Sequence, residues 1–178
     1  KGAPEDVLSV CSAYEVSGKN SKINNDITHK IQNQFQKLSQ DGFRVLGVAY
    51  RELNKNLEVY QKQEESEMIF LGFMAFYDPP KQTATQAVKD LENLGIEIKI
   101  ITGDNELLTE KICRDIELPF KGLVTGKDID SLNDEELGKM AIKNTVFARI
   151  NPAQKERIIL CLKKSGCVVG YMGDGIND

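Results

Sequence analysis

Apolar residues in the first part of the chain switch between helical and strand spacing. They recur at helical intervals over 26–41, which predicts an amphipathic helix that ends at Gly42. The FRVLGVAY segment at 43–50 is expected to form a strand. Polar residues over 51–67 then separate this strand from a second apolar run, MIFLGFMAF at 68–76.

The pattern changes at a domain boundary expected near 66–78, beyond which helical spacing alternates with short β-branched runs. Besides the helix over 26–41, helices are expected over 4–14, 105–116 and 134–142, the last of these with a capping box formed by Asn133 and Glu136. Two more are expected from their end signals. One is capped by Thr83 and ends at Gly95, and the other begins at Asn151 and Pro152 and ends at Gly166. The expected strands of this part are 96–101, 145–148 and 167–172. This alternation favours an α/β fold with a parallel sheet and helices on both of its faces. We assign residues 1–72 to part of an α+β domain and residues 73–178 to the α/β domain.

Composition excludes some classes of function. The 178 residues carry 23 Lys and Arg against 27 Asp and Glu, a net charge of −4, and no segment concentrates its basic residues. Binding to nucleic acid is therefore not expected. The four cysteines and His29 show no metal-ligand spacing, so reduced structural thiols are expected. The longest apolar runs have the length of strands, whereas a membrane helix needs roughly 20 residues.

Two acidic loops directly follow predicted strands, ITGDN at 101–105 and MGDGIND at 172–178. Ligands of open parallel sheets bind beyond the carboxyl ends of the strands, so these loops are expected to meet at one edge. Asp174 and Asp178 supply hard oxygen ligands and Asn177 a neutral one, a set that suits Mg²⁺ beside phosphate. An ordinary surface turn is the alternative, and the position after a buried strand argues against it.

Further candidate residues flank the first of these loops. Thr102, Gly103 and Asp104 offer a hydroxyl, a backbone N–H and a carboxylate in sequence, and the first two can hold a phosphoryl group. The alternative is a strand-ending turn whose side chains bond only to the backbone. Lys155 lies in the first turn of a predicted helix and is either a phosphate-neutralising cation or an ordinary exposed lysine. Arg149 is open to the same two interpretations.

Six segments occur in an order that covers the chain nearly from end to end. They are KGAPE at 1–5, FRVLG at 43–47, DPPK at 78–81, TGDN at 102–105, FARINPAQKERII at 147–159 and MGDGIND at 172–178. This series resembles the ordered signatures of the P-type ATPases. The resemblance implies a haloacid-dehalogenase-like phosphorylation domain into which a nucleotide-binding domain is inserted. It also implies an ATP-driven cation pump that uses Mg²⁺ and ATP and forms an aspartyl phosphate.

For the nucleotide, the resemblance implies a role for five residues of this chain. Lys1 and Gly2 line the adenine-nucleotide pocket, and Arg44 reaches the phosphates. Asp78 lies at the hinge between the domains, near the ribose. Arg149 contacts the nucleotide or stabilises the closed arrangement of the domains.

For the chemistry, the resemblance implies that Thr102 and Gly103 hold the transferred phosphoryl group and that Asp104 supports the same site. Lys155 neutralises the phosphoryl charge, and Asp174 binds Mg²⁺. The remaining members of the implied site are Asn177 and Asp178.

The chain departs from the family pattern in two respects. Lys81 stands where the family has Arg after two prolines, which weakens the expectation of bidentate phosphate contact there. The DKTGT motif of the phosphorylated aspartate does not occur. We therefore expect a piece of a longer parent that supplies the phosphorylated-aspartate strand, the first half of the nucleotide-binding domain and the cation-binding membrane helices. The expected location is the cytoplasmic side of a bacterial plasma-membrane protein, and the isolated piece is expected to be inactive.

Within the family, the segments at 102–113 and 124–137 resemble bacterial magnesium-transporting ATPases. A calcium or other cation pump is an alternative. A stand-alone phosphatase of the haloacid-dehalogenase class and a noncatalytic nucleotide-binding module are two others. KGAPE and FRVLG argue against the phosphatase, because such an enzyme has no use for a nucleotide-binding insert.

Overall fold

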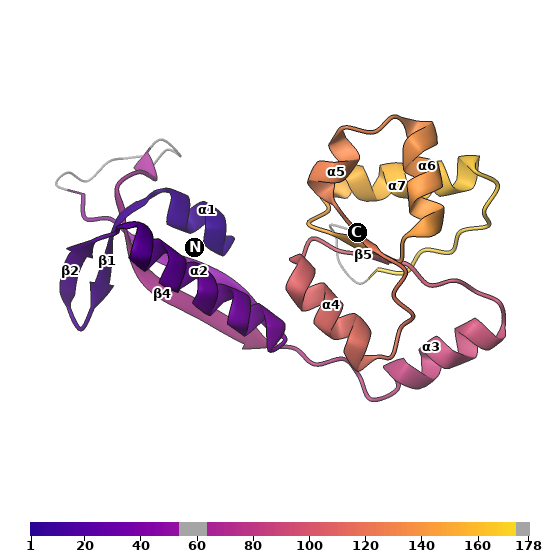
Figure 1. Ribbon diagram of the computed structural model, residues 1–178, viewed down its shortest axis with the longest axis horizontal. Coiled ribbons are helices and arrows are strands. Elements are labelled where there is room, and N and C mark those ends of the chain that lie inside the picture. The colour runs from indigo at the N-terminus through magenta and orange to yellow at the C-terminus, as the bar shows by residue number, and fades with distance from the viewer. Residues whose placement is uncertain (54–63, 174–178) are drawn as a thin grey trace. The chain divides into compact units, whose positions relative to one another are not determined.

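The computed structural model describes residues 1–53 and 64–173. The chain divides into two compact units, Lys1–Asp78 and Pro79–Asp178 (Figure 1). The division follows the last strand of the first unit, which continues to Tyr77. Within the described ranges, no helix is both long and apolar enough to cross a membrane.

The first unit is built on a four-stranded mixed sheet with the strand order β2-β1-β4-β3. Its strands are β1 (Cys11–Val16), β2 (Lys19–Lys22), β3 (Phe43–Tyr50) and β4 (Met68–Tyr77). β1 pairs with β4 in parallel, and the other pairs are antiparallel. The predicted strand at 43–50 is confirmed by β3. The predicted helix over 4–14 is wrong beyond α1 (Pro4–Ser9), because the following residues form β1, whose backbone pairs with β2 and β4.

Both helices of this unit cover the same face of the sheet. α1 and α2 (Asn25–Gln40) each pack on β3. Phe35 of α2 contacts Phe73, with ring centroids 6.2 Å apart, and Phe73 is the cross-strand partner of Gly47. A Cβ atom at Gly47 would lie 3.1 Å from the Cβ atom of Val7, so the glycine allows α1 to approach the strand closely.

The second unit contains a three-stranded parallel sheet with the order β5-β7-β6. Its elements are α3 (Ala84–Asn93), β5 (Ile100–Ile101), α4 (Glu106–Asp115), β6 (Leu123–Thr125), α5 (Gly126–Asp130), α6 (Asp134–Lys143), β7 (Val146–Ala148) and α7 (Pro152–Lys164). Adjacent residues of β7 belong to different core clusters: Val146 packs with Val88 of α3 and Cys113 of α4, whereas Phe147 packs with residues of α5, α6 and α7. Helices therefore cover both faces of the sheet, which confirms the α/β prediction with a parallel sheet.

The predicted helix caps are present at two of three positions. Asn133 and Glu136 form a capping box in which each side chain accepts a 3.0 Å hydrogen bond from the other's backbone N–H. Asn151 caps α7, with Pro152 at its first position. The expectation for Thr83 is wrong, because its side chain makes no cap hydrogen bond and its backbone is already helical, with φ −79° and ψ −8°.

Two predicted strands are shorter than expected or not formed. Of the run at 96–101, only Ile100 and Ile101 are strand residues. Residues 167–172 form no strand, and Val168 and Met172 are 103% and 94% exposed. A β-branched run becomes a strand only where a neighbouring backbone pairs with it, and no described strand does so here.

Candidate functional site

The loops that follow β5 and β7 lie side by side at the carboxyl edge of the parallel sheet. The backbone N–H of Ile150 donates to the carbonyl oxygen of Thr102 at 2.9 Å, and that of Arg149 donates to the carbonyl oxygen of Asp104 at 2.8 Å. These bonds extend the pairing of the two strands into the loops. Residues that are more than forty positions apart in sequence are thereby held in one place.

Within the first loop, the side chains of Thr102 and Asp104 are bound to each other. The Thr102 hydroxyl donates to Asp104 Oδ2 at 3.2 Å and accepts from the Asp104 backbone N–H at 3.1 Å. Gly103 is exposed between them, and a Cβ atom there would lie 3.5 Å from the carbonyl oxygen of Ile150, an ordinary contact. Packing therefore does not require a glycine at this position.

Arg149 connects the second loop to the first through its side chain. Its Nε atom lies 2.9 Å from both carboxylate oxygens of Glu106, the first residue of α4. The Arg149 backbone is left-handed, with φ +55°, a conformation that is uncommon for a residue with a side chain. Sequence reasoning missed Glu106, because an ion pair between distant loops leaves no periodic signal.

Lys155 lies half-buried in the first turn of α7, whose position is fixed by Gln154. The Gln154 side chain is buried; it accepts from the Asn151 backbone N–H at 3.0 Å and donates to the Gly126 carbonyl oxygen at 2.9 Å. It also donates to Asp130 at 2.6 Å, which ties the start of α7 to α5. Sequence reasoning missed Gln154, although its spacing from Asn151 is that of a capping box.

The electrostatics of this edge favour an anion. Both α4 and α7 begin here, and the N-terminus of a helix carries a partial positive charge. α7 has no acidic residue in its first turn and carries Lys155 there. The acidic residue in the first turn of α4, Glu106, is paired with Arg149.

The predicted ligands of the second acidic loop, Asp174, Asn177 and Asp178, lie outside the described residues. Among the residues that are described, no group of three or more His, Cys, Asp or Glu side chains could hold a metal ion by itself. Mg²⁺ does not require such a group, because one or two carboxylates with phosphate oxygens and water suffice. Asp104 is a hard oxygen donor of this kind at the described edge.

The candidate nucleotide residues of the first unit lie along β3 and at the end of β4. Gly2 and Gly47 exchange two backbone hydrogen bonds of 3.1 and 2.9 Å, which places exposed Lys1 beside this strand. Arg44 is exposed on β3, roughly 10 Å from Gly47 at the usual rise per strand residue. Asp78 is exposed and is the last residue of the unit.

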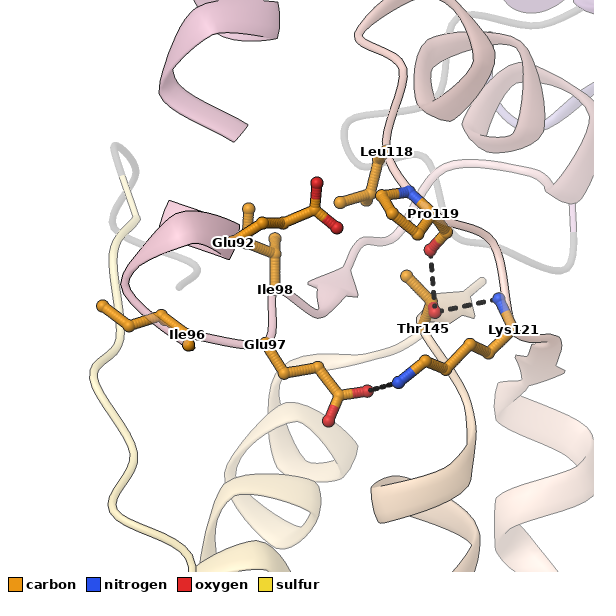
Figure 2. A pocket seen from close by; sticks show the side chains of 9 residues that line it. Glu92, Ile96, Glu97, Ile98, Leu118, Pro119, Lys121 and Thr145 are labelled. Carbon is orange, nitrogen blue, oxygen red and sulfur yellow. Dashed lines mark hydrogen bonds and ion pairs between the residues drawn. The ribbon is translucent and has the colours of Figure 1, made fainter. Parts of the chain in front are cut away.

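A cleft of about 210 Å³ lies elsewhere in the second unit (Figure 2). It is lined by residues that precede the strands, including Ile98, Lys121 and Thr145, at the edge of the sheet opposite the two loops. None of the predicted site residues lines it.

Residues 1–83 match a family model described as P-type ATPase, cytoplasmic domain N. All 178 residues align at 43% identity with an Escherichia coli K12 protein named Magnesium-transporting ATPase, P-type 1, and at 40% with a protein of the same name from Salmonella typhimurium LT2. Calcium-transporting ATPase 1 of Lactococcus lactis aligns with the whole chain at 31% identity. In each case the chain spans only 20% of the relative's length. The family model and these full-chain alignments agree with the order of the six motifs, and the chain belongs to the P-type ATPase family.

Proposed function

We propose that the chain is a catalytic part of an ATP-driven cation pump. Residues 1–72 form the end of its nucleotide-binding domain, and residues 73–178 form most of a haloacid-dehalogenase-like phosphorylation domain. The observation that carries this proposal is the pairing of the loops after β5 and β7. This pairing brings residues 102–104 beside Arg149, at the edge of the sheet where α7 begins and has Lys155 in its first turn.

Phosphoryl transfer is catalysed mainly by positioned cations and hydrogen-bond donors around the transferred group. In the proposed site, the Thr102 hydroxyl and the Gly103 N–H bind its oxygens, and Lys155 offsets its charge. The Thr102 hydroxyl donates its single proton to Asp104 Oδ2, so it would turn from that carboxylate to donate to a phosphoryl oxygen, while the Asp104 backbone N–H keeps its oxygen in place. Mg²⁺, bound by Asp174 with Asn177 and Asp178 nearby, would offset further phosphate charge.

The acceptor aspartate belongs to a DKTGT strand of the longer parent, outside this chain. We place that strand between β5 and residues 167–172, which would give the exposed 167–172 segment the backbone partner that it needs. The exposure of Val168 and Met172 supports this placement.

The nucleotide occupies the first unit in this proposal. Lys1 and Gly2 bind the adenine end beside β3, and Arg44 binds the phosphates. Asp78 lies near the ribose in this proposal, and Arg149 keeps both of its expected roles, a nucleotide contact or a residue that stabilises the closed form of the parent. The positions of Lys1, Gly2 and Arg44 along one strand support a shared pocket.

Magnesium is the proposed transported ion, because the relatives at 43% and 40% identity are named for it. Calcium is the second candidate, favoured by the Lactococcus relative at 31%. The ion would bind in membrane helices of the parent, with this chain on the cytoplasmic side of a bacterial plasma membrane. The partner of the chain is then the rest of the same polypeptide.

Radiolabelled ATP with Mg²⁺, followed by acid quenching, tests this function. The parent is expected to acquire acid-stable phosphate, whereas the 178-residue chain acquires none because it lacks the acceptor. In the parent, Asp174→Asn should impair labelling, and Arg44→Ala should raise the ATP concentration required without lowering maximal labelling. Labelling of the isolated chain, or undiminished labelling of Asp174→Asn, would contradict the proposal.

A further inference from the structure

The backbone of Arg149 is held on two sides within the second unit. Its N–H donates to the Asp104 carbonyl oxygen at 2.8 Å, and its carbonyl oxygen lies close to Gly126, where a Cβ atom would be only 2.5 Å away. These contacts fix a left-handed conformation, with φ +55°, that a residue with a Cβ atom adopts at an energetic cost. A glycine would adopt it without that cost. Backbone packing therefore does not account for an arginine here, and the reason for one lies in its side chain.

Glu106 holds that side chain from the start of α4. The Arg149 Nε atom lies 2.9 Å from each carboxylate oxygen of Glu106. Glu106 is the first residue of α4, and the cap residue Asn105 accepts a 3.0 Å hydrogen bond from the Leu108 backbone N–H, so the carboxylate extends from a capped helical turn. Arg149 is thus bound to Asp104 through its backbone and to Glu106 through its side chain. Both ends of the arginine are anchored to one short segment, which restricts its rotamers.

The contact with Glu106 sets the orientation of the guanidinium group. An arginine side chain has five N–H donors in a rigid plane, and the Nε–H is the donor nearest to the backbone. A carboxylate bound at Nε fixes the direction of that plane while using one of the five donors. Planar recognition of phosphate by arginine depends on this direction as well as on charge.

The charge of Glu106 by itself opposes an anion at this edge of the sheet. The N-termini of α4 and α7 attract an anion, and a carboxylate in the first turn of α4 weakens that attraction unless a cation is bound to it. Arg149 is that cation. The two side chains are 39% and 31% exposed, so solvent screens their attraction only in part.

We propose that Glu106 is a positioning residue that acts through Arg149, holding the guanidinium beside the paired loops in the orientation in which it contacts the nucleotide. This inference rests on the proposed function, and of the two roles expected for Arg149 it selects the contact with the nucleotide. Glu106 itself does not touch the nucleotide in this arrangement. Loss of Glu106 then weakens ATP binding only while Arg149 is present.

A double-mutant cycle in the parent tests this inference, with acid-stable labelling measured over a range of ATP concentrations. Arg149→Ala should raise the ATP concentration for half-maximal labelling about tenfold, because a charged hydrogen bond is lost. Glu106→Ala should raise it roughly two- to fivefold, the size expected for a partly exposed ion pair, without lowering maximal labelling. In the Arg149→Ala background, Glu106→Ala should raise it no further, and removal of a carboxylate that has lost its cation should lower it.

Two further variants separate the contact with Arg149 from the charge that Glu106 gives to the start of α4. Glu106→Asp keeps a carboxylate in the first turn but is one methylene group shorter. It should raise the ATP requirement as Glu106→Ala does, and it provides a second test if Glu106→Ala perturbs the fold. Glu135→Ala removes an exposed carboxylate from the first turn of α6, where its partner Lys139 lies on the same helix, and should leave the ATP requirement unchanged.

The same measurement distinguishes a failure of this inference from a failure of the proposed function. A wild-type parent that acquires no acid-stable phosphate contradicts the proposed function, and the inference with it. If the wild type is labelled, an unchanged ATP requirement in Glu106→Ala overturns the inference alone, as does an equal effect of Glu106→Ala with and without Arg149. A lower ATP requirement in Glu106→Ala would also overturn it, since Glu106 would then hold Arg149 away from the nucleotide.

Discussion

Gly103 and Gly126 lie near the same loop of the second unit but have different reasons to be glycine. A Cβ atom at Gly103 would make an ordinary 3.5 Å contact with Ile150 O, whereas one at Gly126 would lie 2.5 Å from Arg149 O and 2.8 Å from Gln154 Oε1. Gly126 is therefore required by packing. At Gly103, packing leaves room for a Cβ atom, and we propose that this exposed position faces the phosphoryl group.

Alanine substitutions should separate these two roles. Gly126→Ala should destabilise the second unit by about 1–3 kcal/mol, because backbone atoms must move, whereas Gly103→Ala should change its stability by less than about 0.5 kcal/mol. Urea unfolding of both variants measures this difference. In the parent, Gly103→Ala should still slow phosphorylation by ATP. A Gly103→Ala protein that unfolds as easily as Gly126→Ala would show that the loop glycine is structural.

At the scale of residues, the sequence predicted which residues occupy the paired loops. It did not predict the residues whose side-chain bonds fix the positions of these loops and of α7. Thr102 and Asp104 follow a predicted strand, and Lys155 follows a predicted cap, so their neighbourhood could be inferred from the order of elements. Glu106 and Gln154 act through contacts with Arg149 and Gly126, which are distant in sequence. Such contacts depend on how the loops pack, which periodicity does not encode.

At the scale of elements, two aspartates of the second unit accept bonds in their ionised forms, Asp128 within the cap of α5 and Asp134 between α6 and α7. Asp128 accepts from the Thr125 hydroxyl at 2.6 Å and from its backbone N–H at 2.8 Å, in the capping box of α5. Asp134 of α6 accepts from Lys164 and Arg157 of α7, each at 3.0 Å. The Thr125 bonds lower the pKa of Asp128, and the bonds from Lys164 and then Arg157 lower that of Asp134.

These shifts predict a loss of stability in acid. A carboxyl whose folded pKa is depressed contributes stability above its unfolded pKa of about 3.9, and this contribution is lost as the pH falls through the folded value. Urea unfolding at pH 7 and pH 3 should show a lower free energy of unfolding in acid. Asp128→Asn should be less stable than the wild type at pH 7, with a smaller difference at pH 3. A difference that is the same at both pH values would contradict this role of Asp128.

The elements that the sequence predicted correctly are strands with a neighbouring strand to pair with and helices whose capping residues are in their own sequence. The strand at 43–50 pairs along its length with β4, and α6 and α7 have caps and buried apolar residues within their own sequence. The strand expected at 167–172 failed because strand formation needs a neighbouring backbone. The helix expected over 4–14 failed for the converse reason, since β2 and β4 pair with its second half.

At the scale of the whole molecule, the chain corresponds to 20% of the length of its relatives, so some of its surfaces should be covered in the parent. Cys167 tests this directly. It is exposed in the chain, whereas Cys113 and Cys161 are each 1% exposed, and burial raises the pKa of Cys113 to about 11.

Iodoacetamide at pH 8, with mass spectrometric detection, should modify Cys167 of the isolated chain much faster than the two buried thiols. In the parent, the proposed strand beside 167–172 should slow modification of Cys167. Equal rates for Cys167 in the chain and in the parent would argue against a covering strand at this position.

The rate of acid-stable labelling of the parent by ATP tests whether the paired loops and the start of α7 handle the transferred phosphoryl group. Lys155→Met removes the cation proposed to offset the charge of that group, and Lys163→Met removes an exposed lysine at the other end of the same helix. We expect Lys155→Met to slow labelling by roughly 10² to 10³, while Lys163→Met labels like the wild type. Wild-type labelling by a folded Lys155→Met parent would contradict the proposed role of Lys155.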